Sequence, residues 1–118
     1  MEMSEGEYEE LLGGSPWKSA DACDVWITRD HRVIAITAMA DSHLMNTIRF
    51  LRRNQIKYQM AELSRMGRYI ANAPDGAADA CESEAFGIMK LDGDEYLMHR
   101  FQCFRSMMAE VHRRGLTL

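Results

Sequence analysis

The apolar positions follow two patterns along the chain: short apolar runs typical of strands in residues 25–36, and helical spacing after them. Residues 25–28 and 33–36 are short runs rich in β-branched side chains, separated by a polar tetrad. Such runs around a short polar segment are typical of two paired β-strands. We therefore expect a β-hairpin that turns at Asp30 and His31. Histidine suits the second turn position less well than glycine, although it tolerates a positive φ better than most residues.

Apolar residues at helical spacing then predict a helix over residues 42–53. Its apolar positions are Leu44, Ile48 and Leu51, at intervals of four and three. Asp41 and Ser42 stand at its start and are residue types that commonly cap a helix N-terminus.

A second helix should follow, with its apolar face displaced by about one residue from the first. Its apolar positions, all expected in the core, are Ile56, Met60, Leu63 and Ile70. A bend or short break near Asn54 and Gln55 would realign the two faces on one core. Pro74, followed by Asp75 and Gly76, should end this helix.

Residues 75–94 have the least regular pattern. The candidate core residues of this segment are Phe86, Ile88, Met89 and Leu91. We expect residues 87–91 to form one more short strand, which ends in a turn at residues 92–94.

The final segment has the clearest helical pattern of the chain. Its apolar residues, spaced four, three, four and three, are Leu97, Phe101, Phe104, Met108 and Val111. Arg113 and Arg114 would form a cationic last turn, and Gly115 would stop the helix. The pattern predicts one amphipathic helix.

Together these elements predict an α+β fold, with a small N-terminal β-hairpin packed on about three α-helices. The 118 residues, 47% of them hydrophobic, suffice for one core, since domains cluster near roughly 100 to 150 residues. We expect residues 25–118 to form this single domain. Residues 1–24 are acidic and contain a Gly-Gly-Ser-Pro turn cluster, so they should form a partly flexible N-terminal segment.

Sequence features also bear on the cellular location. No run approaches the roughly 18 apolar residues that span a bilayer, and residues 1–10 are acidic where an export signal would be basic and then apolar. Cys23, Cys81 and Cys103 are an odd number of cysteines, which favours reduced thiols over a disulfide framework. These features predict a cytoplasmic protein without a membrane partner.

Charge is segregated along the chain, although the net charge is only −4. Residues 42–72 hold six basic residues and one acid, whereas residues 73–95 hold seven acids and one lysine. We favour mutual neutralisation of these segments in the fold; the alternative is that they form binding surfaces. The candidate acidic contact residues are Glu82, Glu84, Asp92 and Asp94.

A basic helical surface is the best candidate for contact with a nucleic acid or a charged partner. Its residues are Arg49, Arg52, Arg53, Lys57, Arg65 and Arg68. A stripe of this kind could contact phosphates. The acidic net charge and the absence of a recognisable nucleic-acid-binding motif favour a solvated face over that function.

Two small groups of residues carry candidate chemistry. His99 and Cys103, four apart on the predicted last helix, would supply half of a tetrahedral zinc site, but no second pair has metal-binding spacing. Asp41, Ser42 and His43 are the residue types of a hydrolytic triad, although helix capping explains the first two. No phosphate-binding glycine loop is present. We therefore expect no metal, no cofactor and no catalytic site.

Two segments carry a family resemblance. Residues 26–51 contain Trp-Ile-Thr-x-Asp in the hairpin and Met-x-Asp-Ser-His-Leu at the following helix start, and residues 113–116 read Arg-Arg-Gly-Leu. In these motifs the chain resembles small accessory proteins encoded by bacteriophages and prophages. The match covers about a quarter of the chain and these last residues. His31 stands where the family's turn has glycine, and the acidic first two dozen residues also depart from the family.

The resemblance implies origin more than activity, because most such proteins have no assigned biochemical role. Small phage accessory proteins often bind and block a host protein, including CRISPR effectors and other defence machinery. The resemblance thus implies a non-enzymatic protein that binds and inhibits or modulates a host or defence macromolecule in the bacterial cytoplasm. The alternatives are a nucleic-acid-binding accessory protein that uses residues 49–68, and a small metal-binding or hydrolytic protein. An apolar face left uncovered would favour a homodimer.

Overall fold

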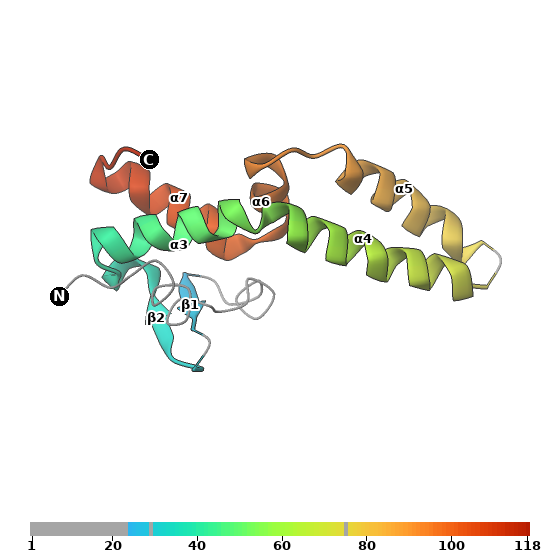
Figure 1. Ribbon diagram of the computed structural model, residues 1–118, viewed down its shortest axis with the longest axis horizontal. Helices are drawn as coiled ribbons and strands as arrows, with labels where there is room; N and C mark the ends of the chain where they lie inside the picture. Colours follow the sequence, from blue (N-terminus) through green and yellow to red (C-terminus); the bar gives the residue numbers. More distant parts are fainter. Residues whose placement is uncertain (1–23, 29, 75) are drawn as a thin grey trace.

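The computed structural model describes residues 24–28, 30–74 and 76–118 (Figure 1). Within them the chain forms two short antiparallel strands, a 3-10 turn and five α-helices. The predicted combination of a small hairpin with helices is confirmed, with five helices in place of about three. The predicted N-terminal segment, residues 1–24, lies outside the described residues except for Asp24. No helix in the described part is long and apolar enough to cross a membrane.

The hairpin forms where the two β-branched runs predict it. β1 (Val25–Ile27) pairs antiparallel with β2 (Val33–Ala35), and Trp26 lies opposite Ile34. Trp26 is fully buried, and Ile34 packs partly buried against the same core. The hairpin therefore contributes one face to the hydrophobic core.

The hairpin turn contains a left-handed residue at the expected position. His31 has a φ of +64°, a conformation that histidine adopts more readily than most residues. The Thr28 N–H donates to the Arg32 carbonyl at 2.9 Å, and the Thr28 hydroxyl accepts the Arg32 N–H at 3.0 Å. The same hydroxyl donates to the Asp30 carboxylate. Thr28 therefore organises both sides of the turn.

α3 (Asp41–Arg53) buries the predicted face but begins one residue earlier than predicted. The fully buried residues of that face are Leu44, Ile48 and Leu51. The predicted capping role of Asp41 and Ser42 is wrong, because Ala40 is the N-cap and no side chain caps the helix. The Leu44 N–H donates to the Ala40 carbonyl at 2.9 Å, which closes the first turn one residue earlier.

The break between the two central helices falls where the displaced apolar face predicts it. The chain leaves α3 at Asn54 and continues as α4 (Gln55–Asn72). Asn54 departs from helical geometry, with φ −100° and ψ 5°, and its side-chain amide donates to the Phe50 carbonyl at 2.9 Å. α4 ends before Pro74, as predicted.

The side of α4 that faces the molecule is largely polar, which corrects the predicted core face. Ile56 and Met60 are 68% and 60% exposed. The buried residues of α4 are Gln55, Gln59 and Glu62, and Leu63 and Ile70 are half-buried. Gln59 Nε2 donates to the carbonyl oxygens of Ile88 at 2.7 Å and Leu91 at 2.9 Å. Polar side chains face inward here because each has a partner: Gln59 donates to these carbonyls, Gln55 donates to Gln59, and Glu62 accepts from Tyr96.

Residues 77–89 form a helix, α5 (Ala77–Met89), so the predicted strand over residues 87–91 is wrong. Its inward positions, spaced three, four and three, are Ala78, Cys81, Ala85 and Ile88. These mostly small side chains let α5 pack closely along α4. Ile88 is buried as predicted, whereas Phe86 and Met89, also expected in the core, are 60% and 58% exposed.

The last amphipathic segment is divided into α6 (Asp94–Arg100) and α7 (Gln102–Arg114), where one helix is predicted. Phe101 between them is extended, with φ −121° and ψ 110°, and fully buried. Its ring meets those of Tyr58 and Tyr96 edge to face, at centroid distances of 5.9 and 6.0 Å. The aromatic contacts place Phe101 in the core at a corner, which a single straight helix would not allow.

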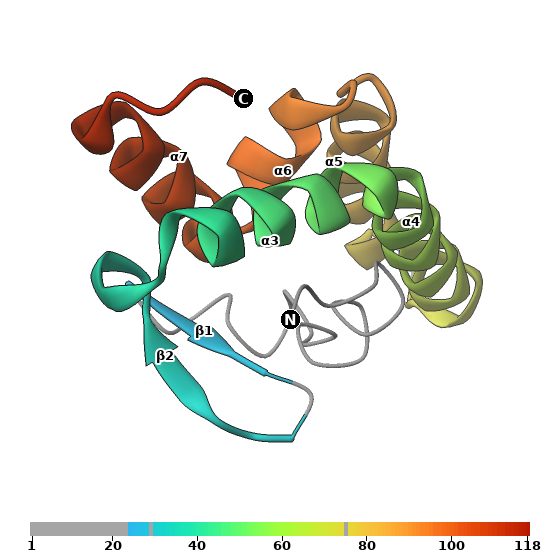
Figure 2. The same ribbon diagram turned by 60° about the vertical axis from the view of Figure 1, so that its left-hand side comes forward.

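The molecule is elongated, with extents of 56 × 27 × 21 Å, and consists of a body and a projecting arm (Figures 1 and 2). α4 and α5 lie side by side and form the arm. The hairpin, α3, α6, α7 and the 3-10 turn η1 (Ile36–Ala38) form the body around most of the core. The arm leaves the body after α3 and returns to it at α6.

Candidate functional site

Oppositely charged segments meet at the base of the arm. Arg52 of α3 donates from Nε and Nη2 to the two carboxylate oxygens of Asp94, at 3.0 and 2.7 Å. Arg52 belongs to the candidate basic set and Asp94 to the candidate acidic set. The fold therefore neutralises this part of the segregated charge internally, as the favoured interpretation expects.

A second charged contact is buried between α4 and α6. The Tyr96 hydroxyl donates to Glu62 Oε1 at 2.9 Å, and the Arg100 guanidinium binds the other carboxylate oxygen. Burial, and then the hydrogen bond to Glu62, raise the pKa of Tyr96 well above its usual range. A carboxylate that is 5% exposed is costly unless it is paired and hydrogen-bonded. This paired carboxylate fixes the arm to α6.

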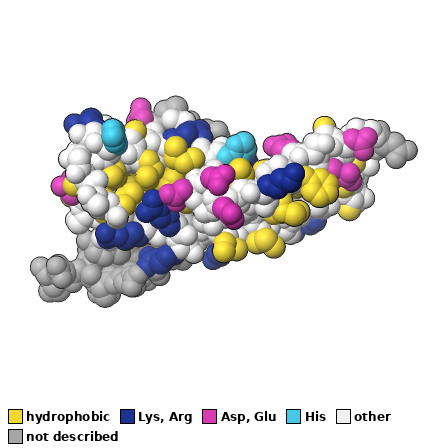
Figure 3. Space-filling model, turned by 90° about the horizontal axis from the view of Figure 1, so that it is seen from above, with side chains coloured by type: hydrophobic (Ala, Val, Ile, Leu, Met, Phe, Trp, Pro, Cys, Tyr) yellow, Lys and Arg dark blue, Asp and Glu magenta, His cyan; other side chains and the backbone are white. Residues whose placement is uncertain are grey.

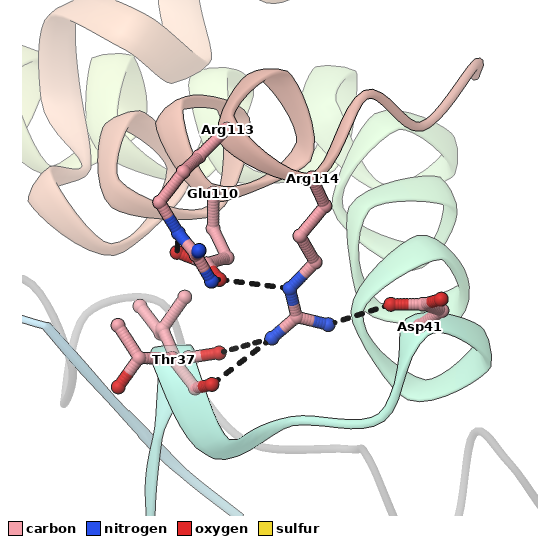
Figure 4. Close-up of polar contacts among 6 residues, drawn as sticks. Thr37, Asp41, Glu110, Arg113 and Arg114 are labelled. Atoms are coloured by element: carbon pink, nitrogen blue, oxygen red, sulfur yellow. Dashed lines mark hydrogen bonds and ion pairs between the residues drawn. The ribbon is translucent and has the colours of Figure 1, made fainter.

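Arg114 joins three elements of the body (Figure 4). Its guanidinium donates to Asp41 Oδ1 at 2.8 Å, to Glu110 Oε1 at 2.8 Å and to the Thr37 carbonyl at 3.1 Å. The Arg114 side chain is only 14% exposed. Gly115 follows with a φ of +69° and ends α7 as predicted.

Glu110 lies between two arginines of its own helix (Figure 4). Hydrogen bonds from Arg113, and next from Arg114, lower the pKa of Glu110 to about 2. The carboxylate is therefore ionised throughout the physiological pH range, and it orients the guanidinium that binds Asp41 and the 3-10 turn.

The residues that carry the family resemblance have structural partners in this fold. Asp41, from the Met-x-Asp-Ser-His-Leu segment, binds Arg114 of the Arg-Arg-Gly-Leu ending across 73 residues of sequence. Trp26 is in the core, and Thr28 and Asp30 form the hairpin turn. These motifs account for contacts that hold the body together, and they do not identify a binding surface.

Three of the four candidate acidic residues remain exposed. Glu82 and Glu84 lie on α5, and Asp92 lies in the turn before α6. Within the described part of the chain none of the three forms an ion pair. They differ in this from Asp94, whose carboxylate is held by Arg52.

The candidate basic residues are distributed over two helices separated by the Asn54 break. On α3, Arg49 donates to the Asn46 side chain at 3.3 Å. On α4, Lys57, Arg65 and Arg68 are exposed, and helical spacing places them on the side away from α5. The structure does not unite the whole predicted set into one stripe.

The proposed half-site for zinc is not formed. His99 is exposed on α6 and Cys103 is fully buried on α7. The extended Phe101 separates them, so they do not share a face of one helix. Burial raises the pKa of the Cys103 thiol to about 11. Within residues 24–28, 30–74 and 76–118, no group of three or more His, Cys, Asp and Glu side chains could hold a metal ion.

Asp41, Ser42 and His43 do not form a triad. They are successive residues in the first turn of α3, so their side chains point in different directions. The Asp41 carboxylate binds Arg114, Ser42 is exposed and His43 is half-buried. Burial, and then the nearby charge of Arg32, lower the pKa of His43.

A shallow hollow of about 400 Å³ lies between α7 and the 3-10 turn. Its polar lining residues include Asp24, Thr37, Gln102, Arg105 and Ser106. The Ser106 hydroxyl donates to Asp24 at 3.2 Å, and Arg105 donates to Gln102 Oε1 at 2.7 and 3.0 Å. These polar groups bind one another and do not converge on the open space.

The arm carries exposed apolar side chains that the sequence pattern assigns to the core. We call them the apolar arm face: Ile56 and Met60 of α4, with Phe86 and Met89 of α5. Figure 3 shows hydrophobic side chains in a row along the lower margin of the α4–α5 half, with charged side chains beside them. The sequence signal that sequence analysis missed is a competing polar stripe on α4, in which Gln55, Gln59 and Glu62 also recur at helical spacing.

We found no match to this chain among protein-family models, curated proteins or solved structures.

Proposed function

We propose that this chain is a non-enzymatic accessory protein, of phage or prophage origin, that binds and inhibits or modulates a host or defence macromolecule. The observation that carries the proposal is the projecting arm. Acidic side chains on α5 and on the turn that follows it stay exposed, whereas Asp41, Glu62 and Asp94 are each paired with an arginine. The resemblance in the hairpin and the helix start supports the phage or prophage origin in this proposal.

The acidic contact surface of this proposal consists of Glu82, Glu84 and Asp92. Charged groups that project on a narrow element can enter a basic channel of a partner. The attraction is the same electrostatics that brings phosphates to such a channel. A protein that occupied a nucleic-acid channel in this way would block it without chemistry of its own.

The side chains that could carry chemistry are engaged in structural contacts or lie apart, which supports a non-enzymatic role. Asp41 binds an arginine, and Cys103 is buried with a raised pKa. His99 lies on a different helix from Cys103. None of these groups is arranged with a second group as nucleophile and base would be.

Affinity capture from a host lysate with charge-reversed variants tests the acidic surface. Glu84→Lys combined with Asp92→Lys should abolish capture of a specific host partner, because both side chains are exposed and their reversal turns attraction into repulsion. Asp94 stays unchanged in this variant, since its ion pair with Arg52 holds the base of the arm. Glu95→Lys, an exposed reversal on α6, is the matched control and should leave capture unchanged.

Retention of the same partner by the doubly reversed variant would contradict the acidic surface. Absence of any specific partner for the wild-type chain would contradict the binding function itself.

Nucleic-acid binding is the second candidate, and the exposed Lys57, Arg65 and Arg68 on the outer side of α4 favour it. Gel-shift affinity measured against salt concentration tests it. Phosphate contacts predict a steep loss of affinity with salt, and Lys57→Ala should lower the slope of log K against log salt by about 1. Affinity without salt dependence would exclude this mode.

A further inference from the structure

The four residues of the apolar arm face lie on the same side of the α4–α5 pair. In each helix the exposed residue directly follows a residue that faces the other helix: Met60 follows Gln59, and Phe86 follows Ala85. A step of one residue rotates by the same angle in the same sense along each helix. Because the two helices are antiparallel, equal rotation from their common contact line leads to the same side of the pair.

The four residues also lie within about two helical turns of one another along the arm. The hydrogen bond from Gln59 to the Ile88 carbonyl sets α4 against α5. It places Met60 beside Met89, with Ile56 and Phe86 one turn away on either side. The row of hydrophobic side chains along the lower margin of Figure 3 agrees with this arrangement. Four large apolar side chains, each 58–68% exposed, thus form one continuous face.

On α4, this face is the part of the apolar stripe that the described part of the fold does not bury. Leu63 and Ile70 of that stripe are half-buried on the side toward α5. Ile56 and Met60 fall outside because the hydrogen-bonded Gln55, Gln59 and Glu62 occupy the inner side. Contiguous exposed apolar side chains rimmed by charge commonly mark an interaction site.

The charged residues beside the apolar arm face indicate which kind of partner fits it. On α4, Lys57 and Arg68, three residues before and eight after Met60, place basic charge beside the face. On α5, Asp79 and Glu82, seven and four residues before Phe86, place acidic charge beside the face. A surface with one basic and one acidic half is complementary to itself under a two-fold rotation that seats α4 of one copy on α5 of the other. A uniformly charged partner would match only one half.

We propose that the apolar arm face is covered by a second copy of this chain, forming a four-helix contact between two arms. Two helices of about 10 Å diameter, over the roughly 20 Å length of α5, offer several hundred Å² per copy. Specific interfaces bury about 800 Å² per partner, so the contact belongs at the smaller end of the range, where weak and transient interfaces are found. The proposal goes beyond the proposed function and leaves Glu84 and Asp92 free for it.

Two oppositely designed charge variants test the second copy directly. Lys57→Glu with Arg68→Glu makes the arm acidic on both helices, and Asp79→Lys with Glu82→Lys makes it basic on both. Sedimentation velocity at concentrations from about 1 to about 100 μM should show the wild-type mass rising toward twice the 13.5 kDa of one chain. Each variant alone should bind itself at least about tenfold more weakly, because like charges oppose one another.

Mixing the two variants should restore a one-to-one dimer, since each basic helix then meets an acidic one. Arg49→Glu in α3 and Glu95→Lys in α6 are control reversals in the body and should dimerise like wild type. Met60→Glu should give a folded monomer, with circular dichroism confirming unchanged helix content. A wild-type chain that stays monomeric at about 100 μM, or variants that fail to recombine, would overturn the proposal. These readouts need no host component, so they are independent of the capture experiment.

Discussion

Single side chains of α7 connect the stability of the body to pH. Glu110 accepts hydrogen bonds from Arg113 and Arg114, and Arg114 in turn binds Asp41. The pKa of Glu110 is lowered to about 2 in the folded protein, whereas an unfolded glutamate titrates near about 4.3. The ionised carboxylate therefore stabilises the fold above about pH 4.3, and this contribution is lost as the pH falls toward about 2.

Glu110→Gln should accordingly be less stable than wild type at neutral pH, with a difference that shrinks as the pH falls from about 5 to about 2. Urea unfolding midpoints at several pH values measure this difference. Glu95→Gln, at an exposed position on α6, is the control and should follow wild type. A gap between Glu110→Gln and wild type that is independent of pH would contradict the assignment.

The Tyr96–Glu62 hydrogen bond is the buried link between α6 and the arm. Tyr96→Phe should lower the free energy of unfolding by about 1–3 kcal/mol, because it removes a donor from a buried carboxylate. Tyr69→Phe, on a side chain that is 55% exposed, should change it by less than about 0.5 kcal/mol.

A double-mutant cycle with Glu62→Leu, which removes the acceptor, isolates the pair. A coupling energy of about 0.5–3 kcal/mol is expected for residues in direct contact. Additive effects of the two changes would show that the hydrogen bond does not contribute to stability.

At the scale of elements, two glycines in helical segments have opposite roles. Gly87 lies inside α5 with no atom within 4 Å of an added Cβ, whereas Gly115 ends α7 with a φ of +69°. Gly87→Ala should stabilise the protein by about 0.5–1 kcal/mol through a lower cost of ordering the backbone. Gly115→Ala should destabilise it by about 1 kcal/mol, because an L side chain is strained in the left-handed region.

Thermal unfolding of both variants against wild type checks this pair of predictions. A lower midpoint for Gly87→Ala would contradict the helical assignment of Gly87, and a higher midpoint for Gly115→Ala would contradict the left-handed end of α7.

The elements that the sequence predicts well are those whose apolar residues face the body core. Leu44, Ile48 and Leu51 of α3 are all fully buried. The break at Asn54 falls at the predicted place, although Ile56 and Met60 of the displaced second stripe do not reach the core. α5 escapes prediction because its inner residues, Ala78 and Ala85 among them, are too small to produce a recognisable apolar stripe. Small inner residues allow close helix packing, and this packing is a tertiary effect that one segment's pattern does not contain.

Two further corrections come from contacts between distant segments. Phe101 has perfect helical spacing with Leu97 and Phe104, yet aromatic contacts with Tyr58 and Tyr96 hold it extended at a corner. Likewise Met60 has the spacing of a core residue, but Gln59 takes the inner position by binding carbonyls 29 and 32 residues away. The apolar arm face exists because polar residues of α4 face inward and apolar ones outward, and the spacing of residues alone does not reveal this.

On the scale of the whole molecule, the arm and the body should differ in local stability. α5 packs mainly on α4 and buries only Ile88. α7 instead buries Cys103, Phe104, Met107 and Val111 in the core. Segments with few buried apolar contacts open at lower free energy than the core of the same protein.

Native-state hydrogen exchange should therefore show α5 amides exchanging faster than α7 amides. The measurement is best made at low concentration, where a second copy would not cover the arm. Met60→Glu provides the same comparison without dimerisation. Equal protection of α5 and α7 would mean that arm and body unfold as one unit.

The ion pair between Arg52 and Asp94 at the base of the arm has a further consequence for the length that the arm can take. The chain leaves and re-enters the body at two points joined by one bidentate ion pair. In the outer part of the arm, beyond Glu62 and Ile88, the two antiparallel helices contact mainly each other. Matched turns could be removed from α4 and α5, or added to them, without moving the scaffold below. The same body can therefore carry arms of different length.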